Sequence, residues 1–164
     1  MPFKKATKTP NKKDSQFSLV NDYGDLKFCL FLGEKSADDW NTYHCSLMIH
    51  DFNTGQFKEL YASNSGSIIS DITVEDLQEL ASFLEKVEIE KNQSHQFHSG
   101  NRDFSLSIAN TEDIFRVTAT IDLITMNTER LDAGHGDSAV SLSFNCTLQE
   151  IKDFYTDLAK WLSN

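Results

Sequence analysis

The sequence predicts an α+β domain with a largely antiparallel sheet and two amphipathic helices packed on one of its faces. Three observations lead to this class. Apolar and polar residues alternate over several short runs, as in β-strands, and the period changes to about 3.6 in two longer segments, as in helices. Short turn sequences join neighbouring strand-like runs, which favours antiparallel pairing. The order along the chain is strands, helix, strands, helix.

The first group of strands begins at residues 26–32, where the run LKFCLFL is apolar on both faces. This composition is typical of a central strand that is covered on both sides. Residues 43–51 alternate cleanly, and the turn at residues 53–55, Asn-Thr-Gly, leads into a further strand over 56–62. A short strand at residues 67–70 completes the group.

The first helix is predicted over residues 74–88, where apolar residues recur at helical spacing. Thr73 and Asp76 have the spacing of a capping box, with Asp in place of the usual Glu or Gln. The outer side of this helix is expected to be acidic. It carries Glu75, Asp76, Glu79, Glu85 and Glu88 against Lys86 alone.

The second half repeats this order, with strands predicted over residues 103–109, 114–123 and 139–146 and a helix over 148–162. Thr147 and Glu150 repeat the capping spacing in front of that helix. The two helical segments share the cap threonine and the spacing of the apolar residues that follow it. This similarity suggests a pseudo-duplicated unit of strands followed by a helix. Because both helices are expected to pack on one face of the sheet, the other face, with its Ser, Thr and His residues, is expected to be in contact with water.

The first 13 of the 164 residues contain five lysines, and the chain's two prolines lie within its first ten residues. Such a segment lacks the apolar groups needed to offset the entropy of ordering. Residues 1–14 are therefore expected to be a disordered basic tail, followed by a single domain over 15–164. The rest of the chain has 10 basic and 25 acidic residues, a net charge of −15. Direct nucleic-acid binding is not expected, because this body would repel phosphate.

No run of 18 apolar residues and no signal-peptide pattern is found in the sequence, so the protein is expected to be cytoplasmic and not to bind membranes. Three cysteines lie within strand-like runs: Cys29, Cys45 and Cys146. Their odd number and their places in the strands indicate reduced, buried thiols rather than disulfides.

Candidate chemistry is sparse. His44, His50 and His95 belong to polar faces, and His95 and His98 are separated by two residues, but no Cys or carboxylate set at metal spacing accompanies them. The histidines are expected to face solvent. The loop from Asp132 to Ser138 contains the parts of a catalytic triad, but its two glycines are more typical of a long connection between strands.

The phosphate-binding, dinucleotide-binding, hydrolase and zinc-protease motifs do not occur in the sequence. The protein is therefore expected not to be an enzyme and to need no cofactor or metal. Two alternatives stay open. One is a small ligand-binding or metal-using enzyme domain on the histidine-bearing face. The other is an adaptor or structural subunit of a larger bacterial assembly.

Several features follow one another over about residues 17–163. They are Leu26-x-Phe28 in a strand, Asp38-Asp39-Trp40 before the second strand, Phe57 in the third, Thr73-x-x-Asp76-Leu77-x-x-Leu80 in the helix, Asp103-Phe104-x-Leu106, and a closing Val140-x-Leu142-x-Phe144 strand with a C-terminal helix. In this order they resemble the WapI-type immunity proteins. The resemblance implies a small bacterial cytoplasmic protein that neutralises the toxic C-terminal domain of a large secreted or wall-associated toxin made by the same cell.

The partner implied by this resemblance is a cognate toxin domain, for example a nuclease, whose surface must be basic to hold phosphate. An acidic body could bind and occlude such a surface. The predicted partner-binding residues are Asp38, Asp39 and Trp40, together with Asp132, His135 and Asp137. The segment from Gly33 to Tyr43 has a simpler interpretation as well, because its small and polar residues suit a plain connection between strands.

Overall fold

A computed structural model describes residues 15–35, 42–59, 68–90, 92–100, 104–111, 114–122 and 139–164. The predicted tail at residues 1–14 lies outside this part of the chain. The strands and helices are β1 (Ser15–Val20), β2 (Leu26–Lys35), β3 (Thr42–Asp51), β4 (Gln56–Glu59), β5 (Ile68–Thr73), α1 (Val74–Ile89), β6 (His95–His98), β7 (Phe104–Thr111), β8 (Ile114–Asp122), β9 (Ala139–Cys146) and α3 (Leu148–Ser163).

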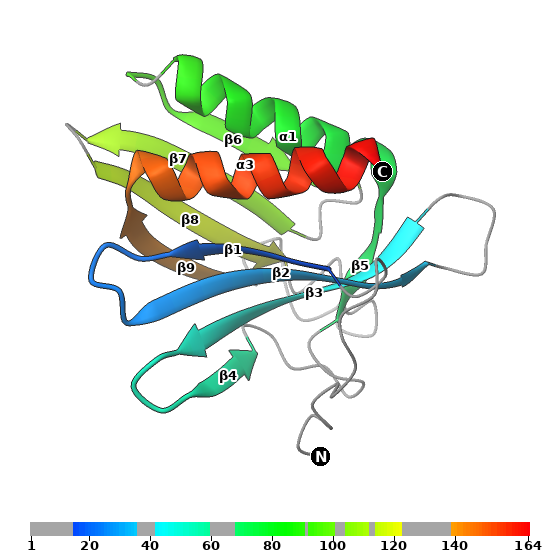
Figure 1. Cartoon of the computed structure of the whole chain (residues 1–164), viewed down its shortest axis with the longest axis horizontal. Coiled ribbons are helices and arrows are strands. Elements are labelled where there is room, and N and C mark those ends of the chain that lie inside the picture. Colours follow the sequence, from blue (N-terminus) through cyan, green and yellow to red (C-terminus); the bar gives the residue numbers. More distant parts are fainter. Residues whose placement is uncertain are drawn as a thin grey trace.

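The predicted α+β class is confirmed, and so is the antiparallel pairing of the strands. The strands form two sheets rather than a single one. The first has the order β1-β2-β3-β4, with β5 also paired to β3, and the second has the order β6-β7-β8-β9. Both helices lie on the same side of the sheets (Figure 1). The predicted repeat of strands followed by a helix is therefore present in the order of the elements.

Neither β1 nor β6 is expected from the sequence. Strand β2 is also longer than predicted, because it continues through Gly33 to Lys35 with a break in the pairing register after Leu32. The connection between β2 and β3 is accordingly shorter than the segment from Gly33 to Tyr43. Tyr43 belongs to β3, and its ring lies edge-on to the Trp161 ring with centroids 5.1 Å apart.

The helices connect the two halves of the chain, because each helix packs against a strand of the other half. Helix α3 follows the second sheet in the chain but packs against β1 of the first sheet, whereas α1 follows the first sheet and packs against β6 of the second as well as β5. The helices also contact each other. The Val20 amide donates to Glu150 Oε2 at 3.0 Å, and the Asp22 amide donates to the Asn145 carbonyl at 2.8 Å. These bonds connect the β1 side of the first sheet to β9 and to the beginning of α3.

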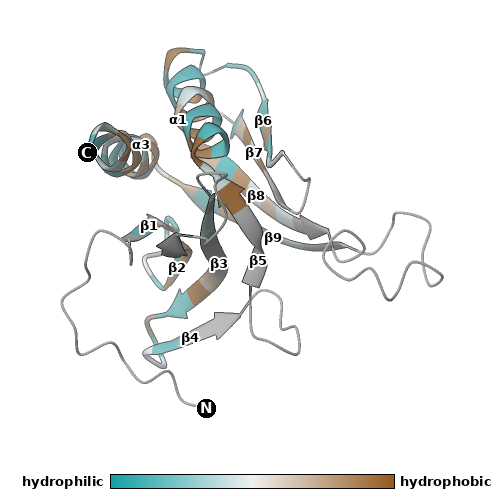
Figure 2. Ribbon diagram, turned by 90° about the vertical axis from the view of Figure 1, so that its right-hand side faces the viewer, coloured by the Kyte–Doolittle hydropathy of each residue, from teal (hydrophilic) through white to brown (hydrophobic). Residues whose placement is uncertain are grey.

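One core lies between the helices and the apolar faces of both sheets. Its aromatic part is built around Phe17 of β1, whose ring centroid lies 6.1 Å from that of Phe154 and 6.4 Å from that of Trp161. Each fully buried side chain of this size stabilises the fold by roughly 1.5–3 kcal/mol through burial alone. Figure 2 shows brown, apolar and teal, polar residues on both helices, and an amphipathic helix gathers the apolar ones on one face. The completely buried members include Leu19, Leu77, Leu80, Val117, Ile151 and Leu158.

The predicted capping box at the start of α1 is confirmed. The Asp76 amide donates to Thr73 Oγ1 at 3.0 Å, and the Thr73 amide donates to Asp76 Oδ2 at 3.2 Å. The expectation that Asp76 belongs to the outer acidic side is wrong, because its side chain is buried. Its second oxygen, Oδ1, accepts the Gly100 amide at 2.9 Å, so the carboxylate also ties α1 to the end of β6.

The first sheet is buried on both faces in its centre. Cys29 and Met48 are paired across β2 and β3 and are buried, although they alternate with the core residues Phe28 and Leu30. The predicted double coverage of β2 is confirmed. Burial raises the pKa of the Cys29 thiol to about 11 and that of the Cys146 thiol to about 12. Both are free cysteines, as expected, while the Cys45 side chain lies outside the described part.

The second sheet differs, because its face away from the core is polar and open to water. Two hydroxyl pairs bridge β8 and β9 there: Thr118 with Ser143 and Thr120 with Ser141, each at 2.9 Å between oxygens. Both pairs are exposed, and the predicted water-facing Ser/Thr surface is present on this sheet.

Candidate protein-binding surface

The six predicted partner-binding residues lie outside the described part of the chain. Asp38, Asp39 and Trp40 belong to the connection between β2 and β3, and Asp132, His135 and Asp137 belong to the connection between β8 and β9. Their assignment to a partner-binding face stays a prediction.

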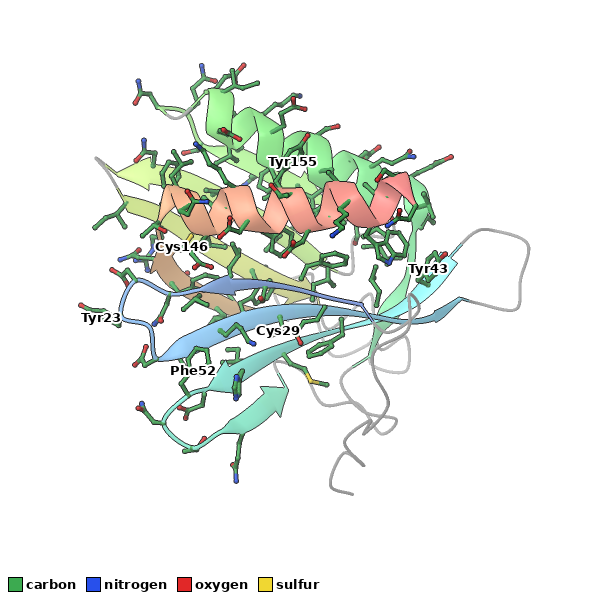
Figure 3. All side chains as sticks on the ribbon, viewed as in Figure 1. Tyr23, Cys29, Tyr43, Phe52, Cys146 and Tyr155 are labelled. Carbon is green, nitrogen blue, oxygen red and sulfur yellow. The ribbon has the colours of Figure 1, made fainter. Side chains whose placement is uncertain are left out.

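Within the described residues, two exposed aromatic side chains mark one end of the first sheet. Tyr23, in the turn between β1 and β2, is 86% exposed, and Phe52, in the turn between β3 and β4, is 44% exposed. Figure 3 shows both side chains at the same end of the molecule, with Tyr23 directed away from the body. The exposed part of each aromatic ring contributes no burial energy to the fold, so it is available for an interface.

The turn that carries Tyr23 is held by the buried side chain of Asn21. Its Oδ1 accepts the amides of Asp25 and Leu26, each at 3.1 Å, and its Nδ2 donates to Asp25 Oδ1 at 2.6 Å. Gly24 has a positive φ of 72°, a conformation in which an L side chain would be strained. The ring of Tyr23 is therefore presented from a backbone that is fixed on several sides.

The second turn is fixed to the first. The Phe52 amide donates to the Asp25 carbonyl at 2.9 Å, so the turns between β1 and β2 and between β3 and β4 form one unit. Asp51 Oδ1 accepts the Asn53 amide at 2.9 Å, and Gly55, with a φ of +69°, closes the second turn. Little backbone freedom is left to be lost on binding, which lowers the entropic cost of forming an interface here.

The environment of Phe52 is aromatic and cationic. The His50 ring lies 4.8 Å from the Phe52 ring between centroids, in an edge-on arrangement. Lys27 Nζ lies 5.8 Å from the Phe52 centroid, within the cation–π range of about 6 Å. These neighbours hold one side of the Phe52 ring and leave the remainder exposed.

Three carboxylates belong to residues close to these two rings in the chain. We use the name aromatic turn surface for the set Tyr23, Phe52, Lys27, Asp22, Asp25 and Asp51. It combines two exposed rings with three acidic groups and one basic group. Such a surface suits an apolar contact framed by basic side chains of a partner, because aromatic residues anchor interfaces and complementary charge guides the encounter.

The histidines are not brought together. His50 lies in the first sheet and His95 in the second, and the His44 side chain lies outside the described residues. His98 is exposed, as expected, but His95 is not, because its side chain is only 11% exposed. Its Nε2 lies 3.0 Å from the Glu90 carbonyl oxygen. In the part of the chain that the structure describes, no three His, Cys, Asp or Glu side chains are grouped as metal ligands.

Tyr23 and Phe52 are not predicted as site residues, because hydrophobic periodicity identifies strands and helices and both residues lie in turns. The segment Asn21-Asp-Tyr-Gly-Asp25 contains a usable signal, because turn-forming residues on both sides of an aromatic residue place that residue on an exposed turn. The contact between the two turns has no such signal, since it depends on the pairing of β2 with β3.

Comparisons with known proteins give little further information. No family model matches the chain, and no curated protein matches it. A solved structure described as the MRP1/MRP2 proteins of Trypanosoma bruciei is similar over 91% of this chain and 83% of its own, with 10% identity and a TM-score of 0.43. Across the described residues, no helix is both long enough and apolar enough to cross a membrane. Neither a family nor an activity follows from these comparisons.

Proposed function

We propose that this chain is a non-enzymatic, cytoplasmic immunity protein that binds and occludes a basic toxin domain, as the resemblance to the WapI-type proteins implies. The observation that carries the proposal is the exposure of Tyr23 on a rigid turn beside three carboxylates. The predicted residues Asp38, Asp39, Trp40, Asp132, His135 and Asp137 extend the same proposal to the two connections outside the described part.

Tyr23 is well suited to anchor an interface. Its side chain combines a large apolar ring with a hydroxyl that can find a hydrogen-bond partner, and tyrosine is enriched among the residues that dominate binding energy. A fixed turn adds to this, because the free protein already holds the ring in place. If this ring is buried against a partner, its removal should change the free energy of binding far more than the stability of the free protein.

The charge of the described residues supports a basic partner. Apart from the buried Asp76, helix α1 and its cap residue Glu90 carry five acidic residues and one lysine. The aromatic turn surface adds three carboxylates with one lysine. A negative surface attracts a basic protein over a distance comparable to the Debye length and raises the rate of association. Toxin domains that act on nucleic acid require basic surfaces, which makes such a domain a suitable partner.

The proposal is tested by growth rescue. The toxic domain encoded beside this gene is expressed together with the wild-type chain or with a Tyr23→Ala, Phe52→Ala double variant. Wild-type protein should restore growth, and the double variant should lose the rescue. The matched control is Ile89→Ala, which removes a side chain that is 73% exposed at the end of α1. A double variant that rescues as well as wild type would remove the aromatic turn surface from the partner-binding face.

The predicted aspartates are tested by a binding measurement. Charge reversal by Asp38→Lys and Asp39→Lys should weaken the complex with the toxic domain, because it replaces attraction to a basic surface by repulsion. The dissociation constant of the purified complex gives the measurement. A complex of unchanged affinity would remove Asp38 and Asp39 from the proposed face while leaving Tyr23 to be judged on its own variants.

A further inference from the structure

A concavity of about 310 Å³ lies between α1 and β6. Its size is at the lower end of the range for ligand sites, roughly 300–1,000 Å³. Figures 1 and 2 both show β6 alongside α1 at one margin of the second sheet. The lining residues are Glu79, Ser82, Phe83 and Lys86 from α1 and His95, Gln96, Phe97 and His98 from β6.

Two apolar side chains contribute to this concavity, and one of its walls is strand β6. The buried rings of Phe83 and Phe97 lie 6.1 Å apart between centroids. Strand β6 is the end strand in the described order of the second sheet, and all four of its residues line the space. Among the described strands, only β7 pairs with β6. The outer edge of an end strand can accept another strand through main-chain hydrogen bonds.

The opposite wall is formed by residues on one face of α1, with an acidic residue at one end and a basic residue at the other. Glu79, Ser82 and Lys86 follow one another at helical spacing, and Lys86 is seven positions after Glu79, or about 10.5 Å along the axis. Helix and strand run in opposite directions. The Glu90 carbonyl lies at His95, and Asp76 Oδ1 binds the Gly100 amide. Glu79 therefore faces the His98 end of β6, and Lys86 faces the His95 end.

We propose that this groove binds an extended segment of a partner protein, which adds to β6 as an antiparallel strand. Such a strand enters at the His98 end and leaves at the His95 end. A basic side chain near its beginning would meet Glu79, and an acidic side chain near its end would meet Lys86. Residues four apart on one face of a strand are separated by about 13.5 Å, which long side chains can match to the helix spacing. The inference goes beyond the proposed function and uses a surface separate from Tyr23.

Two peptides of identical composition test the direction and the charge order. The first is carboxyfluorescein-Gly-Gly-Lys-Val-Thr-Val-Glu-amide, and the second is carboxyfluorescein-Gly-Gly-Glu-Val-Thr-Val-Lys-amide, so the label is on the N-terminus and the lysine keeps its charge. Fluorescence anisotropy at low salt should show about three- to tenfold tighter binding of the Lys-first peptide, the range expected for exposed ion pairs. A Glu79→Lys, Lys86→Glu double variant should invert the preference. Both substitutions are at exposed positions of α1, and circular dichroism verifies that the variant is folded.

The site is located independently by NMR. Addition of the Lys-first peptide should shift the amide resonances of residues 95–98, and a Tyr23→Ala variant should bind the peptide with unchanged affinity. The inference is overturned if neither peptide binds at millimolar concentration, if both proteins show the same order of preference, or if the shifts lie outside α1 and β6. These outcomes are separate from the growth rescue assay, so either proposal can fail alone.

Discussion

The two sheets differ on the face that points away from the core. In the first sheet this face carries the neighbouring residues Cys29 and Met48, and in the second it carries Thr118 and Ser143. The first pair is buried, whereas the second pair is exposed and joined by a hydroxyl–hydroxyl bond of 2.9 Å. One sheet therefore contributes to stability through both of its faces, and the other through one. The outward face of a strand must be judged from its own side chains, because the repeated order of strands and helix does not make the two sheets equivalent.

This difference also bears on function. The middle of the open face of the second sheet carries small hydroxyl residues that hydrogen-bond to one another across β8 and β9. Ile114, at the beginning of β8, is the large apolar residue that this sheet exposes among its described positions. The groups suited to binding lie instead at margins of the sheets. They are the aromatic rings on the two turns of the first sheet and the groove beside β6 of the second.

The largest expected effect is on the buried outward face of the first sheet. Met48→Ala should lower the free energy of unfolding by roughly 2–5 kcal/mol, because it removes buried methylene groups and leaves a cavity. Urea denaturation gives the measurement. Leu106→Ala, at a core position of the second sheet, is the control and should show a loss of the same order. If Met48→Ala changed stability by less than about 0.5 kcal/mol, the two sheets would not differ as described.

The next effect appears at alkaline pH. Burial favours the neutral thiol, and it raises the pKa of Cys29 from 9.0 to about 11 and that of Cys146 to about 12. The unfolded chain therefore loses these protons before the folded chain does. Their contribution to stability is fully present below pH 9 and is lost progressively as the pH rises through the range between 9 and 12.

Unfolding measurements between pH 8 and 11 test this dependence. Cys29→Ala and Cys146→Ala should each show a shallower decline of stability than wild type, since each removes one ionising group. At pH 8 neither thiol of the folded protein should react with a thiol reagent, whereas both should react in urea. Rapid labelling of Cys29 in the native state would contradict its burial on the outward face of the first sheet.

A smaller effect is expected on the hydroxyl face. Thr118→Ala should lower the free energy of unfolding by only about 0.2–1 kcal/mol, because the bond that it removes is exposed and water can replace the partner. Ser143→Ala is the matched variant and should give a similar loss. In the double variant the two effects should not add, since both remove the same bond. A loss above about 2 kcal/mol would show that this face is not simply solvated.

The smallest effect on stability belongs to the aromatic turn surface. Tyr23→Ala should change the free energy of unfolding by less than about 0.5 kcal/mol, because the ring is 86% exposed and the turn is held by Asn21. Asn21→Ala is the contrasting variant and should be clearly destabilising. Thermal or urea unfolding of both variants gives the comparison. A strongly destabilised Tyr23→Ala protein would mean that loss of growth rescue reports folding rather than binding.

Much of this fold could be predicted from the sequence. Both helices begin at the predicted residues and extend one residue beyond the predicted ends, because capping threonines and long apolar periods define them. Strands β8 and β9 also begin at predicted residues. Local pattern is sufficient where a segment has many apolar residues at one period.

The missed elements have weak patterns. β6 is only four residues long and has one buried apolar side chain, Phe97, between its two histidines. β1 is little longer, with Phe17 and Leu19 as its buried apolar residues. These strands are stabilised mainly by their neighbours: β2 and α3 for the first sheet, β7 and α1 for the second. Such long-range contacts leave no periodic signal.

The sequence predicts the acidic character of the candidate site but not which residues form it. The acidic character of the chain can be counted in the sequence, but the position of each carboxylate cannot. Asp76 fits both a cap and an acidic outer side, and only its contact with Gly100 shows that its second oxygen faces inward. The union of the Tyr23 and Phe52 turns likewise depends on the pairing of strands, which fixes the bond between Phe52 and Asp25.

The crosswise packing of the helices affects how the chain can fold as it is synthesised. Strand β1 is made first among the described elements, yet the helix that covers it, α3, is made last. The apolar side of β1 therefore lacks its packing partner during synthesis until residues from 148 onward have emerged from the ribosome. During this interval Phe17 and Leu19 are open to chaperones, or to the α3 of another nascent chain, which could exchange helices with its neighbour.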